Sequence, residues 1–256
     1  MSRGLLGDEI LSELAKELPD LAEMAETVLS LPLGFIPVHF PPESHVPVAA
    51  VCLHDAKCTV EEARYAFHEV LAHRKWYLEK REEPNEDAAV FFGRFYTDDT
   101  ALRLYSVSEH LAKAIVYMLE ITKQDLEPYQ KKNRISLQVV VGHYLINKHP
   151  THPVTKAVLR LVNSAEWRKT VNYRNAWVHN QPPTVKGTGI VYQRRSRWQV
   201  SDSGALLTFG GGDEPRYSID DLVGFVRPSL FLFVEVLTEV AKFYAGLVRE
   251  RAAVPM

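Results

Sequence analysis

The chain has 256 residues, of which 46% are hydrophobic, and it carries 30 lysines and arginines against 32 aspartates and glutamates. A chain of this length and composition folds as a globular protein whose core needs neither disulfides nor a metal. The formal net charge of −2 excludes a broad basic surface for nucleic acid, so any nucleic-acid site has to be local.

The N-terminal region combines short amphipathic segments with many prolines. Apolar residues recur at spacings of three and four over residues 8–30, and Pro19 interrupts them, which predicts two short helices or one kinked helix. Residues 31–58 contain five prolines, so they are predicted to lie over the core as an extended arm. We therefore expect residues 1–58 to form an N-terminal helix and a proline-rich arm.

Helical patterning begins again at Thr59, a favourable N-cap, and predicts a helix to about residue 81. An aromatic stretch follows over residues 87–96. Residues 98–100, Asp-Asp-Thr, are typical of the start of another helix. The buried face expected for that helix consists of Leu104, Val107, Leu111, Ala114, Ile115 and Met118.

The C-terminal half predicts three more helices and one hairpin. The helices are expected over residues 133–147, 153–180 and 218–251, the last capped by a serine at its first position. Residues 187–209 alternate apolar and polar side chains around a Ser-Asp-Ser-Gly turn, which indicates a short β-hairpin. The predicted fold is all-α, a helix bundle over residues 59–256 with an inserted short β-hairpin and the proline-rich N-terminal arm.

The sequence also indicates a compartment. Its two cysteines, Cys52 and Cys58, are few enough to favour a reducing environment. The uncharged apolar run over residues 228–234 is far shorter than the roughly 20 residues of a membrane span. We expect a cytoplasmic protein with no membrane association.

A metal site is one hypothesis that the cysteines raise, because Cys52, His54, Asp55 and Cys58 lie within seven residues and are all zinc-ligand types. Their spacing does not match a zinc knuckle, and no second ligand pair follows at zinc-finger distance. Two partly buried thiols explain them more simply. We expect no metal, and phosphate-binding loops and serine nucleophile elbows are absent from the sequence as well.

The segment 171–183 carries the strongest chemical signal, because it places Arg174 five positions before His179 with asparagines beside both. On a straight helix this offset turns the two side chains roughly 140° apart. Pro182 and Pro183 predict that the helix ends near His179, which lets the imidazole swing back toward the arginine. Such a pair is suited to a phosphodiester, since arginine donates a planar fork to phosphate oxygens and a neutral histidine transfers protons.

At these residues the chain resembles the HEPN superfamily, helical-bundle proteins that often carry an arginine, four to six residues, then a histidine, with a polar residue directly after the arginine. Arg174, Asn175 and His179 match that pattern. The resemblance implies a homodimer in which two such sets face one cleft. It also implies a metal-independent endoribonuclease of the toxin, defence or RNA-processing type, with no cofactor. Its partners would be RNA and an antitoxin or regulatory protein.

In this resemblance Arg174 binds and stabilises the phosphate, His179 is the general acid or base, and Asn175 orients them. A second pair, Arg103 and His110, also fits the spacing. We prefer the later pair, because Leu104 follows Arg103 where a polar residue is expected and both residues are predicted in the middle of a helix.

RNA-binding residues are predicted on the hairpin, where Arg194, Arg195 and Arg197 precede Trp198. Cations beside an aromatic ring suit a single-stranded RNA, although a solvated hairpin turn has the same composition. Three aromatic residues near the motif are candidates either for base stacking or for the core: Trp167, Tyr173 and Trp177.

An alternative function needs no catalysis. Arginine and histidine near a helix C-terminus are favoured by the helix dipole and by the last free carbonyls. In that interpretation the protein is an inactive helical dimer or interaction protein, and Arg174 and His179 form a structural helix cap.

Overall fold

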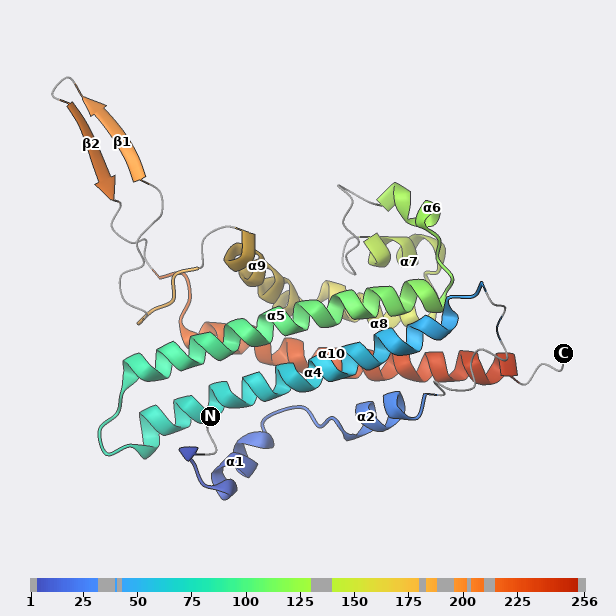
Figure 1. The fold of residues 1–256 in the computed structure, drawn as a ribbon, viewed down its shortest axis with the longest axis horizontal. Helices are drawn as coiled ribbons and strands as arrows, with labels where there is room; N and C mark the ends of the chain where they lie inside the picture. Colours follow the sequence, from blue (N-terminus) through green and yellow to red (C-terminus); the bar gives the residue numbers. More distant parts are fainter. Residues whose placement is uncertain are drawn as a thin grey trace.

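The computed structural model describes residues 4–31, 40, 43–129, 140–179, 183–187, 196–201, 204–209 and 215–252. It confirms the predicted all-α helix bundle. Three long helices form its axis: α4 (Val46–Lys75), α5 (Glu86–Met118) and α10 (Ile219–Ala252). Figure 1 shows α4 and α5 as an antiparallel pair, with α10 beside them, α1 and α2 along one side, and α8 and α9 along the other.

The predicted start of a helix at Thr59 is wrong, because α4 already begins at Val46. Pro47 lies in its first turn, where the missing N–H has no intrahelical partner to lose. Residues 46–58 therefore belong to the bundle and not to an arm, and the predicted boundary at residue 58 falls inside a continuous helix. The other prolines of the predicted arm, Pro32, Pro37, Pro41 and Pro42, lie outside the described residues.

The aromatic stretch and the helix predicted after it are one helix, α5. Asn85 caps it, since its side-chain oxygen accepts a hydrogen bond from the backbone N–H of Ala88 at 2.9 Å. Asp98 and Asp99 lie in the middle of α5. Asp98 accepts a hydrogen bond from Tyr173 of α9, and Asp99 accepts one from Arg103, one turn further along α5. A pair of aspartates resembles a helix start in the sequence, and only the partner elements show that it is not one.

The single helix predicted over residues 153–180 is two helices, α8 (Pro153–Asn163) and α9 (Ala165–His179). Ser164 separates them and caps α9, because its hydroxyl accepts from the backbone N–H of Trp167 at 3.1 Å. This break lets α9 change direction and cross α5.

The shorter elements differ less from expectation. The two N-terminal helices are confirmed as α1 (Asp8–Ala15) and α2 (Ala22–Leu29). α7 (Gly142–Lys148) covers the end of the helix predicted over residues 133–147, and residues 130–139 lie outside the described part. The short turn of α6 (Lys123–Leu126) was not predicted, although Thr122 and Asp125 cap it reciprocally.

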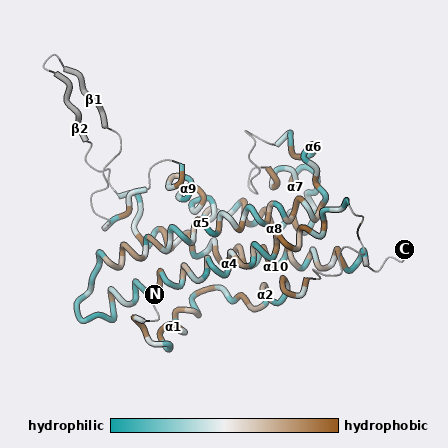
Figure 2. The backbone as a smooth tube through the Cα atoms, in the orientation of Figure 1, coloured by the Kyte–Doolittle hydropathy of each residue, from teal (hydrophilic) through white to brown (hydrophobic). Residues whose placement is uncertain are grey.

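The core joins the long helices through the predicted apolar faces. All eight residues of the α10 stripe are buried: Leu222, Val226, Leu230, Phe233, Leu237, Ala241, Tyr244 and Val248. Trp167 of α9 packs edge-on against Phe233, with ring centroids 4.7 Å apart. Figure 2 shows hydrophobic and hydrophilic residues alternating around each long helix, as expected for helices with one buried side.

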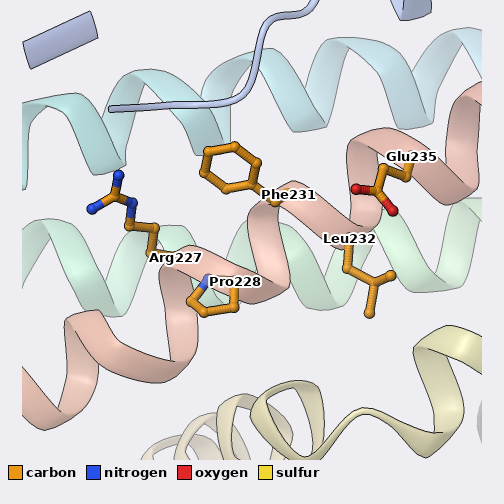
Figure 3. A pocket seen from close by; sticks show the side chains of 5 residues that line it. All are labelled: Arg227, Pro228, Phe231, Leu232 and Glu235. Carbon is orange, nitrogen blue, oxygen red and sulfur yellow. The ribbon is translucent and has the colours of Figure 1, made fainter. Parts of the chain in front are cut away.

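Helix α10 continues through Pro228, which cannot donate a backbone hydrogen bond to the preceding turn. A shallow hollow lies over this turn (Figure 3), lined by Arg227, Pro228, Phe231, Leu232 and Glu235. The charged residues at its two ends are ion-paired to other elements, Arg227 to Glu17 and Glu235 to Arg160. The hollow is therefore bordered by ion pairs that join α10 to Glu17 and to Arg160 of α8.

In the region predicted as a hairpin, β1 (Ser196–Ser201) pairs antiparallel with β2 (Gly204–Phe209), and Trp198 stands opposite Leu207. The segments before and after the hairpin, residues 184–186 and 216–217, are hydrogen-bonded to each other. The backbone N–H of Arg216 donates to the carbonyl of Thr184 at 3.0 Å, and that of Lys186 donates to the carbonyl of Tyr217 at 2.8 Å. Among the residues described, no helix is both long and apolar enough to cross a membrane.

A buried histidine and glutamate lie between α4 and α5. His73 is 3% exposed and stacks on the rings of Phe92 and Tyr96, while its Nε2 lies 3.4 Å from a carboxylate oxygen of Glu69. Burial lowers the pKa of His73 below 6.5, although the carboxylate of Glu69 opposes the change. The neutral form of His73 is thus the one that fits the fold.

This burial predicts a loss of stability in acid. Below about pH 6.5 the unfolded chain binds a proton at His73 that the folded chain resists, so the free energy of unfolding falls by up to about 1.4 kcal/mol per pH unit. We expect His73→Gln, which keeps a polar side chain beside Glu69 but cannot be charged, to flatten this slope in urea titrations between pH 7 and 5. The exposed His143→Gln should keep the wild-type slope. Parallel curves for His73→Gln and wild type would contradict the assignment.

Candidate phosphodiester site at the end of α9

Arg174 and His179 lie together at the C-terminal end of α9. The described part of α9 runs to His179. The Nη1 of Arg174 lies 3.5 Å from the Nε2 of His179 and donates to the side-chain oxygen of Asn175 at 3.1 Å. Because a guanidinium can only donate, a hydrogen bond across this contact has the Nε2 of His179 as its acceptor. A proton acceptor and a permanent cation therefore occupy one site.

The guanidinium of Arg174 is supported by an aromatic ring rather than by a carboxylate. Its central carbon lies 3.8 Å from the centroid of the Tyr105 ring on α5. Its Nε is buried without a hydrogen-bond partner, and among the described residues no aspartate or glutamate forms an ion pair with Arg174. The cation is held in place but its charge is not neutralised.

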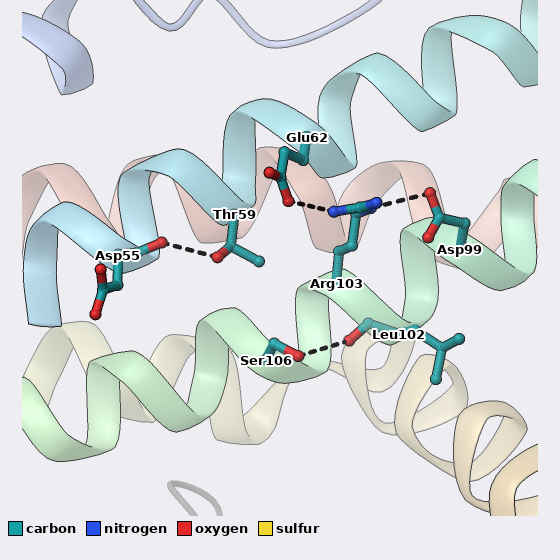
Figure 4. A network of polar contacts seen from close by, with 7 residues as sticks. All are labelled: Asp55, Thr59, Glu62, Asp99, Leu102, Arg103 and Ser106. Carbon is teal, nitrogen blue, oxygen red and sulfur yellow. Dashed lines mark hydrogen bonds and ion pairs between the residues drawn. The ribbon is translucent and has the colours of Figure 1, made fainter.

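The second sequence match has a different environment. Arg103 is paired with two carboxylates, Asp99 at 2.9 Å and Glu62 of α4, and Figure 4 shows it between them. His110 lies 4.0 Å from a carboxylate oxygen of Asp55. Arg103 therefore ties α4 to α5, and its charge is already satisfied within the bundle.

Behind the motif, a buried polar contact joins α9 to α5. The hydroxyl of Tyr173 donates to Asp98, and Arg94 lies on the other oxygen of that carboxylate at 3.6 Å. Burial raises the pKa of Asp98, while its contacts with Tyr173 and Arg94 oppose the rise. Burial and the neighbouring Asp98 also raise the pKa of Tyr173, which keeps its hydroxyl protonated as a donor.

Sequence reasoning missed three residues that surround the motif: Arg94, Asp98 and Tyr105. Asp98 and Tyr105 are seven positions apart and so share one face of α5. That spacing was a usable signal, but nothing in the sequence identified α9 as the helix that crosses this face.

The aromatic candidates divide between core and surface. Trp167 and Tyr173 are buried in the core, and only Trp177 is partly open, at 36%. Of the predicted RNA-binding residues, Arg194 and Arg195 lie outside the described part of the chain. Arg197 and Trp198 belong to β1, where the backbone pairs them with Thr208 and Leu207.

The candidate metal ligands all lie on α4 rather than in an arm. Cys52 is buried and Cys58 is exposed, and burial raises the pKa of the Cys52 thiol. Within the described ranges no group of three or more histidines, cysteines, aspartates or glutamates is placed to hold a metal ion. The geometry thus offers no support for the hypothesis of a metal at Cys52, His54 and Cys58.

Comparisons with protein-family models, with curated proteins and with solved structures find no match to this chain. Functional inference therefore rests on the residues themselves. The arrangement that distinguishes itself chemically is Arg174 with Asn175 and His179.

The stacking of Arg174 on Tyr105 predicts an energetic coupling between α9 and α5. A double-mutant cycle of Tyr105→Leu and Arg174→Met should give an interaction free energy of about 1 kcal/mol in urea unfolding. Tyr105→Leu combined with Arg168→Met, an exposed arginine on the same helix, is the matched control and should give a value near zero. Equal values for the two cycles would show that the ring does not support the guanidinium.

Proposed function

We propose that the protein is a metal-independent endoribonuclease of the HEPN type, with its site at Arg174, Asn175 and His179. One observation carries the proposal: a half-buried guanidinium, with no carboxylate partner among the described residues, lies 3.5 Å from an exposed imidazole. A cation held without an anion costs stability unless a ligand supplies the negative charge. Phosphate, like carboxylate, presents oxygens whose geometry matches the arginine fork.

The proposed reaction uses both groups on one phosphodiester. The Nη2 of Arg174 has no partner among the described residues and donates to the phosphate oxygens, where negative charge grows in the transition state. The contact between Arg174 and the Nε2 of His179 is exchanged for the ribose when RNA binds, and Nε2 then accepts the proton of the 2′-hydroxyl. That oxygen then bonds to phosphorus and the bond from phosphorus to the 5′-oxygen breaks. The leaving oxygen takes a proton from water, and His179 returns its own proton to the solvent, which restores the neutral ring. Asn175 fixes the guanidinium through its side-chain oxygen.

The contacts of Arg174 favour this role over a helix cap. A cap would donate to the last carbonyls of α9, whereas the two described hydrogen-bond contacts of Arg174 go to side chains.

We further propose that Arg194, Arg195, Arg197 and Trp198 hold the RNA. The support is their place in the chain, because the segment that leads into the hairpin, residues 183–187, begins only four residues after His179. Gly187 of this segment lies against Val90 of α5, where an added Cβ would come within 3.1 Å of the valine. The inserted chain therefore starts against α5, the helix whose Tyr105 also contacts Arg174.

The proposal predicts RNA cleavage that depends on His179. Purified protein incubated with mixed RNAs in EDTA should cut them, and His179→Ala should lower the rate about 100-fold or more, since proton transfer contributes that much. Arg174→Ala should cause a similar loss. Cleavage is followed on gels and by mass spectrometry, which should identify cyclic phosphate ends.

His110→Ala is the matched control, because it alters the second sequence match and should leave cleavage unchanged. An RNA with 2′-O-methyl groups should resist cutting. Replacing Arg194, Arg195 and Arg197 together with serine should raise KM and leave kcat within about twofold. Equal cutting by wild type and His179→Ala would rule out the proposed site.

A second candidate function is homodimer formation without catalysis, with an antitoxin or regulatory protein as the further partner that the resemblance described above implies. It is favoured by Trp177 and Val178, apolar residues that are 36% and 41% exposed beside the motif. It predicts that Trp177→Ser with Val178→Ser lowers the dimer fraction in sedimentation equilibrium at least tenfold, while the exposed Ile146→Ser on α7 does not. A monomeric wild type would contradict it.

A further inference from the structure

Helix α5 holds the motif segment at both of its ends. At one end, the hydroxyl of Tyr173, the residue directly before Arg174, donates to Asp98. At the other end, the Nη2 of Arg94 donates to the backbone carbonyl of Pro183 at 3.3 Å. Pro183 is four residues beyond His179, so the two contacts bracket all three motif residues.

The two contacts are coupled through α5 itself. Arg94 and Asp98 are one helical turn apart, and the Nε of Arg94 lies 3.6 Å from the second oxygen of Asp98. Their side chains are only 17% and 14% exposed. A buried carboxylate needs a cation and hydrogen bonds to remain in the fold, and here Tyr173 and Arg94 supply both. The guanidinium of Arg94 thus contacts the Asp98 carboxylate and the Pro183 carbonyl at the same time.

Pro183 is followed by a short segment, residues 184–186, whose backbone is itself held in place. Residues 184–186 exchange backbone hydrogen bonds with residues 216 and 217 at the start of α10. Arg94 therefore joins α5 to an anchored segment, and in the sequence the last described turn of α9 lies between the two residues that α5 holds, Tyr173 and Pro183. The last turn of a helix otherwise frays, because its carbonyls lack intrahelical partners.

We propose that Arg94 is a positioning residue for His179. By holding Asp98 and the Pro183 carbonyl at once, it keeps the final turn of α9 closed and the imidazole within reach of Arg174. The inference rests on the proposed function for its catalytic meaning, but the restraint on α9 is measurable without catalysis.

The test is Arg94→Lys. A lysine keeps the charge beside Asp98 but lacks the fork that reaches Pro183 at the same time. Arg103→Lys is the matched control, because Arg103 also lies on α5, also pairs with an aspartate one turn away, and ties α5 to α4 instead of to α9. Both variants should melt within a few degrees of wild type.

Two readouts separate positioning from a purely structural role. Amide hydrogen exchange should rise about tenfold in residues 175–179 of Arg94→Lys and stay unchanged in α4 and α10. For RNA cleavage, kcat per folded molecule should fall about tenfold with KM within twofold. Added guanidinium should restore part of the kcat of Arg94→Ala. Arg103→Lys should change none of these.

The outcomes distinguish the two proposals. If Arg94→Lys behaves as Arg103→Lys does in exchange and in kcat, the positioning role is overturned. If exchange rises but the wild type cuts no RNA, the proposed function fails and the restraint on α9 stands. Should Arg94→Lys unfold, Asp98→Asn replaces it, since the amide still accepts from Tyr173 but weakens the pairing with Arg94, and the same two readouts apply.

Discussion

The packing of α5 is the constraint on which the rest of the structure depends. Along its 33 residues it lies against α4, α9 and α10, so its side chains have to serve three neighbours. Apolar residues meet this demand along most of its length, and Leu104, Val107 and Leu111 are fully buried. Where α9 crosses, α5 presents Asp98 and Tyr105 instead, and a polar crossing of this kind is stable only when each group has a partner.

That crossing explains why two arginines with the same sequence pattern differ chemically. Arg103 faces α4 and is neutralised by Glu62 and Asp99. Arg174 faces Tyr105, whose ring attracts the cation through its π-electrons, and no carboxylate of the described part of the chain pairs with it. The ion pairs of Arg103 join α5 to α4, whereas the contact of Arg174 with Tyr105 leaves the guanidinium suited to an anion from outside the bundle. This difference supports the choice of Arg174 and His179 as the candidate site.

Much of the architecture could be predicted from local signals. The apolar stripe of α10, its serine cap and the two N-terminal helices all follow from periodicity and capping chemistry. The errors lie where a local signal has two meanings. Pro47 marks the first turn of a helix and not an arm, Asp98 and Asp99 bind partners in mid-helix, and Ser164 breaks what reads as one continuous helix.

By itself, the sequence determined the helical class, the buried faces and the presence of Arg174, Asn175 and His179 near a helix end, because these depend on residues within a few turns of each other. Only the tertiary structure decided which arginine keeps its charge unpaired, since that depends on Tyr105 and on the absence of a nearby carboxylate among the described residues. It also brought Arg94 to Pro183, which are 89 residues apart in the chain. Contacts of this range arise from helix crossing, and helix crossing is set by the packing of the whole core.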